Sequence, residues 1–298
     1  MKTSVALCTY NGEKYLVEQI ESILSQEIAV DEIVICDDAS TDETFSILKN
    51  YENRFPEIFR IFINEKNLGY VANFEKALSL CSGEIIFLCD QDDIWKQEKV
   101  SSVLHYFKEN PTIGIVAHDL NLIGTYEGKK TFWELRNFSA EKKLSNPELL
   151  KQILLKGNIF PGMTLAIRRE TLQEYLPLQK VDSIIIHDYE LLIRSLRDQK
   201  FGLLPQTLAS YRQHENQSIG FSENIKSQTS ELVKIQFRSE HHLRLQKYTA
   251  AFNLNPKIVE EYRNEIKEKY SLFLKEFSFP QRIVVHLKNK YYYKILHF

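Results

Sequence analysis

The first 110 residues repeat one pattern, in which a short apolar run is followed by a polar turn and then by a stretch with helical spacing. The strand candidates cover residues 4–8, 32–36, 59–63 and 85–89, in which most positions are apolar. Their length and their β-branched and aromatic residues predict buried strands. The stretches 13–26, 43–51, 70–80 and 94–109 place apolar residues three or four positions apart, which predicts helices. Strands that alternate with helices form parallel sheets with right-handed crossovers, so we expect an open, mainly parallel α/β sheet flanked by helices.

Polar side chains follow three of these predicted strands at the point where each strand ends. They are Thr9 and Asn11 after the first strand, Asp37 and Asp38 after the second, and Asp90, Asp92 and Asp93 after the fourth. Ligands of open α/β sheets bind outside the carboxyl ends of the strands. We therefore expect the three clusters to meet in one cleft.

The third cluster places three carboxylates in four positions, with no basic residue among them. Two like charges about 4 Å apart repel by about 4 kcal/mol at an effective dielectric near 20. A hard divalent cation would offset this repulsion, and Mg²⁺ or Mn²⁺ is commonly held by one or two carboxylates plus substrate phosphates. The alternative is that Asp93 only N-caps a helix that begins at Ile94.

Several classes of function are disfavoured. No G-x-G-x-x-G follows the first strand, and no G-x-x-x-x-G-K-[ST] is present, which argues against a dinucleotide-binding enzyme and a P-loop nucleotidase. The net charge of −2 argues against a nucleic-acid partner bound through bulk positive charge. The four cysteines lack C-x₂-C spacing and indicate reduced, buried thiols in a cytoplasmic protein.

The pattern is looser between residues 111 and 220. We expect strands at 113–117, 163–167, 201–204 and 207–211, a loop region at 124–146, and helices at 147–155 and 189–197. The last of these helices is preceded by His187 and Asp188, and Asp188 is placed to cap it.

From about residue 222 the chain is rich in Glu, Lys and Gln with helical spacing, which predicts a C-terminal helical region. Residues 281–298 carry four basic residues, several aromatic residues and no acid. Such a tail suits peripheral contact with an anionic membrane surface, and the alternative is a packed terminal helix with solvated lysines. No run approaches 18 apolar residues and no secretory signal is evident, so we expect a cytoplasmic protein, with peripheral contact at the inner face of the plasma membrane.

Six motifs taken together resemble the family 2 glycosyltransferases, in the right order over residues 3–220. They are Cys8-Thr-Tyr-Asn-Gly12, Cys36-Asp-Asp-Ala-Ser-Thr-Asp42, Asn67-Leu-Gly-Tyr-Val-Ala-Asn73, Asp90-Gln-Asp-Asp-Ile-Trp95, His187-Asp188 and Tyr211-Arg-Gln-His214-Glu-Asn216. The detailed variants are most similar to bacterial rhamnosyltransferase-type members, which build cell-surface polysaccharides.

The resemblance implies a GT-A fold, with residues 1–110 as the nucleotide-sugar half, 111–220 as the acceptor half and 221–298 as a C-terminal helical region. It also implies an inverting enzyme that depends on Mg²⁺ or Mn²⁺. The donor would be a nucleoside diphosphate sugar, either dTDP-rhamnose or a UDP-sugar. The acceptor would be a growing glycan or lipid-linked glycan.

The resemblance also assigns roles to individual residues. Thr9 and Asn11 match the cradle of the nucleotide, Asp38 matches the carboxylate that binds the pyrimidine ring, and Asp90 matches the residue on the ribose side. Asp92 and His214 match metal ligands, although a lone histidine at a strand end is often structural. Asp188 matches the general base, because inversion needs a carboxylate near the acceptor hydroxyl.

Two other functions remain open at this point. A sugar nucleotidyltransferase uses a related sheet, but it carries a basic glycine-rich loop after the first strand that residues 9–12 lack. A non-catalytic subunit that binds nucleotide sugars would also keep the fold. The intact carboxylates Asp38, Asp90, Asp92 and Asp188 argue against it.

Overall fold

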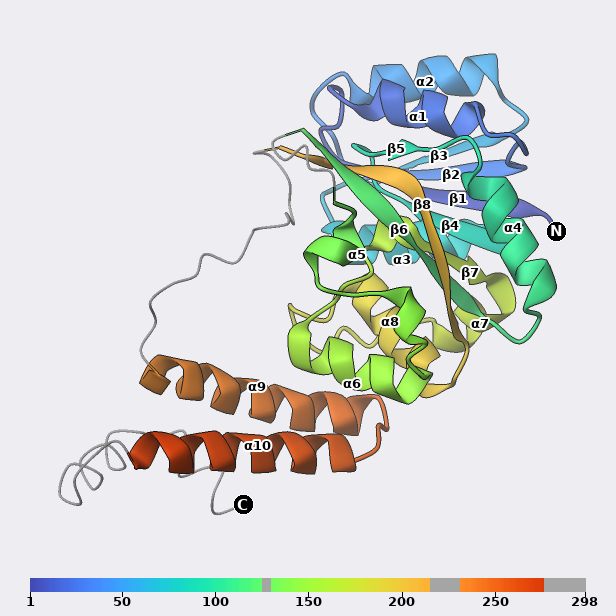
Figure 1. Ribbon diagram of the computed structural model, residues 1–298. Coiled ribbons are helices and arrows are strands. Elements are labelled where there is room, and N and C mark those ends of the chain that lie inside the picture. Colours follow the sequence, from blue (N-terminus) through green and yellow to red (C-terminus); the bar gives the residue numbers. More distant parts are fainter. Residues whose placement is uncertain (125–129, 215–230, 276–298) are drawn as a thin grey trace. The chain divides into compact units, whose positions relative to one another are not determined.

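The computed structural model describes residues 1–124, 130–214 and 231–275. The chain divides into two compact units, Met1–Gly220 and Phe221–Phe298. The described part of the second unit consists of helices α9 (Glu231–Ala251) and α10 (Lys257–Leu274), which pack together and confirm the predicted C-terminal helices (Figure 1). The basic tail at 281–298 lies outside the described residues, so its proposed membrane contact stays a prediction.

Within the described residues, eight strands form one curled sheet (Figure 1). They are β1 (Thr3–Thr9), β2 (Glu32–Asp37), β3 (Phe59–Ile63), β4 (Ile85–Cys89), β5 (Ile94–Trp95), β6 (Ile115–Gly124), β7 (Leu165–Arg168) and β8 (Phe201–Gln213). Their order across the sheet is β3-β2-β1-β4-β7-β6-β8-β5. The expected open α/β sheet is confirmed.

The first four strands form the parallel part of the sheet. β1 pairs in parallel with β2 on one side and with β4 on the other, and β2 pairs with β3. Every residue of β1, β2 and β4 is buried, as expected for parallel strands covered on both faces. The strand order reverses between β1 and β4, and a crevice opens outside the carboxyl ends of the strands at such a point.

The second part of the sheet is mixed, because β7 runs antiparallel to both β4 and β6. Its first residues therefore lie at the same edge as the carboxyl end of β4. β8 is parallel to β6 and antiparallel to β5, which follows the carboxylate cluster directly. The chain of the second half thus reaches the edge at which the first-half strands end, at the end of β6, at the start of β7 and at the end of β8.

Helices cover both faces of the sheet (Figure 1). In the described part of the first unit they are α1 (Leu16–Leu24), α2 (Thr44–Arg54), α3 (Tyr70–Leu80), α4 (Lys99–Glu109), α5 (Phe132–Leu135), α6 (Asn146–Lys156), α7 (Arg169–Tyr175) and α8 (His187–Arg197), with the short 3-10 helices η1 (Ala140–Lys142) and η2 (Gly162–Thr164). α1 and α2 lie on one face, and α3 and α8 lie on the other. None of the helices in the described ranges is both long enough and apolar enough to cross a bilayer.

Three local predictions are wrong, and a fourth is correct except for its first two residues. The helix expected from Ile94 begins at Lys99, because Ile94 and Trp95 pair with β8 as a strand. The two short strands expected at 201–204 and 207–211 are the single strand β8, whose pairing with β6 shifts register on either side of Asp119. The loop expected at 124–146 includes α5 and η1. The strand expected at 163–167 begins at Leu165 instead.

The two capping alternatives are also wrong. Asp93 caps no helix, since it precedes β5 and its Oδ1 accepts a hydrogen bond from the backbone N–H of Arg212 at 3.0 Å. The N-cap of α8 is Ile186, and Asp188 lies within the first turn. Neither carboxylate is an N-cap, although Oδ1 of Asp188 accepts a hydrogen bond from the backbone N–H of Tyr189.

Candidate functional site

A cavity of about 1020 Å³ lies at the edge of the sheet where β1, β2 and β4 end. Its lining comes from both halves of the first unit, including the turns after the parallel strands, the first turns of α3 and α8, and the end of β8. All seven residues to which the resemblance assigns a role line it: Thr9, Asn11, Asp38, Asp90, Asp92, Asp188 and His214. The expectation that separate acidic segments meet in one cleft is confirmed. The role of each residue stays a prediction.

Asp38 is buried and holds the loop before α3 in place. Its Oδ1 accepts hydrogen bonds from the side chain of Asn64 at 2.7 Å and from the backbone N–H of Leu68 at 2.8 Å. Its Oδ2 accepts one from the backbone N–H of Gly69 at 2.9 Å. A carboxylate oxygen can accept two hydrogen bonds, so Oδ2 keeps capacity for a donor group of a ligand in the cavity.

The side-chain oxygens of Thr9 and Asn11 form hydrogen bonds with the end of β2 and the loop that follows it. The hydroxyl of Thr9 donates to Oδ1 of Asp37 at 2.8 Å. The side-chain oxygen of Asn11 accepts from the backbone N–H of Thr41 at 2.8 Å, and Asn11 adopts the left-handed conformation that asparagine tolerates, with φ 47°. These bonds tie the β1 turn to the β2 loop, so both loops form one rigid wall of the cavity.

Gln91 fixes the same turn, although the sequence analysis gave it no role. Its Oε1 accepts from the backbone N–H of Tyr10 at 2.8 Å, and its Nε2 donates to the carbonyl of Tyr10 at 3.0 Å. A Cβ on Gly12 would lie 2.2 Å from that Oε1. A side chain at position 12 would therefore displace the Gln91 amide, and glycine leaves room for it.

Burial and mutual repulsion both act on the carboxylates after β4. Burial, followed by the charges of Asp92 and Asp188, raises the pKa of Asp90 to about 7. Burial also raises the pKa of Asp93, whose Oδ2 has no hydrogen-bond partner. Burial and repulsion disfavour simultaneous ionisation of these carboxylates. A bound cation would reduce the repulsion between them.

A basic residue does lie behind the cluster, although none stands within it in the sequence. Lys99, on the first turn of α4, is fully buried, and its Nζ donates to the carbonyl of Met163 at 2.8 Å and lies 3.8 Å from the centre of the Trp95 ring. Burial lowers the pKa of Lys99 to about 7, while Asp93 and Asp90 act in the opposite direction. Trp95 is thus a packing residue beneath the site.

Asp92 and His214 face each other at the cavity wall, with 2.8 Å between Oδ2 of Asp92 and Nε2 of His214. Arg212 brings them together, because its Nε donates to the carbonyl of Asp92 at 2.9 Å while its backbone N–H binds Asp93. The ring of Tyr15 packs against His214 with 4.9 Å between ring centres. One carboxylate and one imidazole from distant segments therefore meet at a single point.

This pair suits a divalent cation. Carboxylate oxygen and imidazole nitrogen are both ligands of Mn²⁺-type ions, and the open cavity leaves coordination positions for substrate oxygens. Among the described residues, no group of three or more His, Cys, Asp or Glu side chains is placed to hold a metal by itself. A cation held by Asp92 and His214 would take its further ligands from a substrate or from water.

Asp188 lies across the cavity on the first turn of α8. Its Oδ1 accepts from the backbone N–H of Tyr189 at 2.6 Å, and its Oδ2 accepts from the side chain of Asn158 at 3.2 Å. Burial raises the pKa of Asp188 to about 6. The carboxylate is therefore ionised at neutral pH, with a pKa close to the value that general-base catalysis favours. Sequence reasoning missed Asn158, which lies in an irregular loop and carries no periodic signal.

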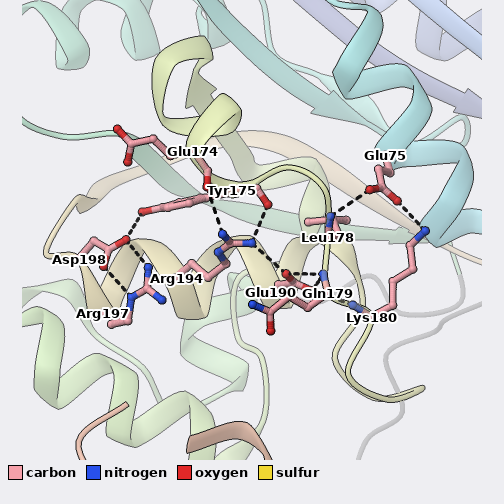
Figure 2. Close-up of polar contacts among 10 residues, drawn as sticks. All are labelled: Glu75, Glu174, Tyr175, Leu178, Gln179, Lys180, Glu190, Arg194, Arg197 and Asp198. Atoms are coloured by element: carbon pink, nitrogen blue, oxygen red, sulfur yellow. Dashed lines mark hydrogen bonds and ion pairs between the residues drawn. The ribbon is translucent and has the colours of Figure 1, made fainter. Parts of the chain in front are cut away.

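The segment that leads into α8 is held by Glu190, a buried carboxylate two residues beyond Asp188 (Figure 2). Both oxygens of Glu190 accept from the backbone N–H of Gln179, and Oε2 also accepts from that of Lys180 at 3.2 Å. Arg194 pairs with Glu190 at 3.2 Å and donates to the carbonyl of Tyr175 at 2.6 Å. These hydrogen bonds and the ion pair hold segment 176–186 against α8, the helix that carries Asp188.

Glu75 on α3 joins the same segment to the half of the unit that contains the parallel strands (Figure 2). Its Oε1 accepts from the backbone N–H of Leu178 at 2.9 Å, and its Oε2 pairs with Nζ of Lys180 at 2.6 Å. α3 also contributes Tyr70 and Phe74 to the cavity. The two halves are therefore joined beside the cavity by defined polar contacts.

Comparisons with known proteins agree with this arrangement. The sequence matches Glycosyl transferase family 2 over residues 4–176. The uncharacterized protein Mb1547 of Mycobacterium bovis is 31% identical over 214 residues, which cover 71% of this chain and 58% of that protein. The dTDP-rhamnosyl transferase RfbG of Shigella flexneri is 28% identical over 237 residues, which cover 76% and 78% of the two chains. This chain thus spans less than two thirds of the Mycobacterium relative.

Solved structures resemble the fold. S. aureus TarS in complex with UDP has a TM-score of 0.57 and 18% identity, covering 95% of this chain and 77% of its own. The mannosyltransferase PcManGT from Pyrobaculum calidifontis, in complex with GDP-Man and Mn²⁺, has a TM-score of 0.55 and 16% identity, covering 96% and 79%. These likenesses confirm the expected GT-A fold. With the match over residues 4–176 and the converging motifs, the chain belongs to glycosyl transferase family 2.

Proposed function

We propose that this chain transfers a sugar from a nucleoside diphosphate donor to a hydroxyl group of a glycan, with inversion at the anomeric carbon and with help from a divalent cation. The observation that carries the proposal is the shared cavity, in which Asp38, the Asp92–His214 pair and Asp188 all take part. The relative RfbG is named a dTDP-rhamnosyl transferase, which supports dTDP-rhamnose as one donor candidate. A UDP-sugar is the other.

The donor occupies the side of the cavity formed by the parallel strands. Asp38 accepts a hydrogen bond from the pyrimidine ring through Oδ2, Asp90 faces the ribose, and the turn of Thr9 and Asn11 supports the nucleotide. Asp92 and His214 would hold Mg²⁺ or Mn²⁺, which when bound neutralises charge on the departing diphosphate.

Asp188 acts on the acceptor. Its carboxylate takes the proton of the acceptor hydroxyl, and the hydroxyl oxygen forms a bond to the anomeric carbon. The bond from that carbon to the diphosphate oxygen breaks, and the nucleoside diphosphate leaves with the bonding electron pair. Attack opposite the leaving group inverts the configuration, and positioned general-base catalysis contributes about 10²- to 10⁴-fold in rate.

The acceptor is a growing cell-surface glycan, carried on a lipid in the simplest case. An enzyme of this kind would act in the cytoplasm at the inner face of the plasma membrane. The basic, aromatic tail at 281–298 supports this location through its composition.

Incubation of the chain with dTDP-rhamnose or a UDP-sugar, Mn²⁺ and a polysaccharide extract tests the proposal. We expect release of the nucleoside diphosphate and loss of activity when the metal is chelated. Release of pyrophosphate would indicate a sugar nucleotidyltransferase instead. Binding of the donor without any release, with or without acceptor, would indicate a non-catalytic subunit.

A further inference from the structure

His187 is a cavity residue to which neither the motif roles nor the proposed chemistry assigns a task. It is the first residue of α8 and directly precedes Asp188. Its side chain lines the cavity although the residue is only 5% exposed. The ring stacks on that of Phe74 with 4.1 Å between centres and 16° between planes, and the ring of Tyr70 lies edge-on at 6.5 Å. The position of the imidazole is therefore fixed by aromatic packing.

The polar atoms of this ring are not used within the fold. Nδ1 is buried and has no hydrogen-bond partner. Nε2 lies on the side of Gly162, another cavity residue, and a Cβ at Gly162 would be 3.4 Å from it. We assign the ring proton to Nε2, because an N–H at Nδ1 would be left without an acceptor. The ring thus offers an unused N–H donor at the cavity wall.

The charge of the ring indicates which kind of ligand it suits. Burial lowers the pKa of His187 to about 3, so the imidazole is neutral at physiological pH. A neutral donor in a partly apolar setting suits an uncharged hydroxyl better than a phosphate, for which charged donors are the strong partners. The stacking partner Phe74 lies on α3, which belongs to the nucleotide-binding half, so the ring lies on the donor side of Asp188.

We propose that His187 donates a hydrogen bond from Nε2 to a hydroxyl group of the donor sugar and thereby selects the sugar that the site accepts. This inference rests on the proposed function, since it requires a nucleotide sugar in the cavity. A site built to bond a hydroxyl discriminates against sugars that lack it, because the buried donor is then left unpaired. His187 would therefore contribute to recognition of the sugar and not of the nucleotide.

The test compares the affinity for a nucleotide sugar with that for its free nucleotide, measured by calorimetry on the full chain in Mn²⁺. The probes are dTDP with dTDP-rhamnose and UDP with UDP-glucose. His187→Phe keeps the stacking on Phe74 and removes both ring nitrogens, whereas His187→Gln restores an N–H donor. Melting temperatures of the variants report whether each is folded.

For the nucleotide sugar that the wild type binds more tightly than its free nucleotide, we expect His187→Phe to weaken binding about tenfold, the scale of one lost hydrogen bond. Binding of the free nucleotide stays unchanged, and His187→Gln recovers part of the loss. The inference is overturned if His187→Phe leaves sugar binding unchanged, if it weakens both ligands equally, or if neither sugar adds affinity in the wild type. If the wild type binds no nucleotide at all, the proposed function itself is contradicted.

Should His187→Phe fail to fold, His187→Gln is compared with His187→Leu in the same assay. The inference then requires that the Leu variant loses sugar affinity that the Gln variant keeps. Equal affinity of these two variants for the nucleotide sugar would overturn it.

Discussion

The side-chain Nδ2 of Asn158 donates a hydrogen bond to Oδ2 of Asp188 at 3.2 Å, and Oδ1 of Asn158 accepts one from the backbone N–H of Phe160 at 2.8 Å. The second bond orients the amide so that its N–H group faces the carboxylate. A donor to a carboxylate favours its charged form, which opposes the effect of burial on this group. Asn158 is therefore a positioning residue for the proposed base.

Replacing Asn158 with leucine should lower kcat about tenfold, because the carboxylate loses its orientation and one bond to its ionised form. The acid limb of the kcat/KM profile should also move to higher pH, a change that loss of packing alone would not produce. Asn50→Leu, on the exposed side of α2, is the matched control and should change neither quantity. An unshifted acid limb in Asn158→Leu would show that the bond does not tune Asp188.

The pH profile of the wild type follows from the pKa of Asp188, which burial raises to about 6. The carboxylate accepts a proton only when it is ionised, so activity should be nearly constant above pH 7. Below pH 6 it should fall tenfold for each further pH unit. Steady-state kcat/KM between pH 4.5 and 8.5 measures this limb, and a profile that stays flat down to pH 4.5 would contradict the assignment.

Gly162 allows the backbone of η2 to pass close to the two residues that begin α8. A Cβ at this position would lie 3.3 Å from Cβ of Asp188 and 3.4 Å from Nε2 of His187. Gly162→Ala should therefore displace Asp188 by a few tenths of an ångström and lower kcat at least tenfold, since catalysis depends on near-attack geometry. Binding of the nucleoside diphosphate should be retained. If Gly162→Ala keeps the wild-type kcat, catalysis does not depend on the close packing of Gly162 against Asp188.

Ala39 follows Asp38 in the left-handed conformation, with φ 62°. A non-glycine residue there is strained by about 1 kcal/mol, so Ala39→Gly should raise the free energy of unfolding by about that amount. The same substitution at Ala77, in the interior of α3, should lower it by about 1 kcal/mol or more. Urea unfolding of both variants measures these changes. A lower free energy of unfolding in Ala39→Gly would contradict the claim that Ala39 is strained.

The sequence predicted the parts of the fold that depend on the local pattern of apolar and polar residues. β1, β2 and β4 are buried on both faces, so each is largely apolar, and polar residues at their carboxyl ends then lie at one edge. This reasoning located Asp38 and Asp92 in one cavity. The roles of these residues came from resemblance to a family, because side-chain type alone does not distinguish a ligand from a cap.

Long-range pairing was not predictable in the same way. Ile94 and Trp95 have helical neighbours in sequence, yet they pair with Ser210 and Ala209 on β8. Lys99 stands in an amphipathic helix pattern, and only tertiary packing buries it behind the carboxylates. Such contacts depend on how separate segments pack together, and no local period signals them.

The central claim is that one cavity separates metal-assisted donor binding, at Asp92 and His214, from proton removal, at Asp188. Calorimetric binding of UDP and dTDP with and without Mn²⁺, alongside donor turnover, tests it in Asp92→Ala and Asp188→Asn. We predict that Asp92→Ala loses the Mn²⁺-dependent part of nucleotide binding. Asp188→Asn should bind as the wild type does and lose turnover by about 10²- to 10⁴-fold. Wild-type turnover in both variants, or loss of nucleotide binding in Asp188→Asn alone, would contradict the claim.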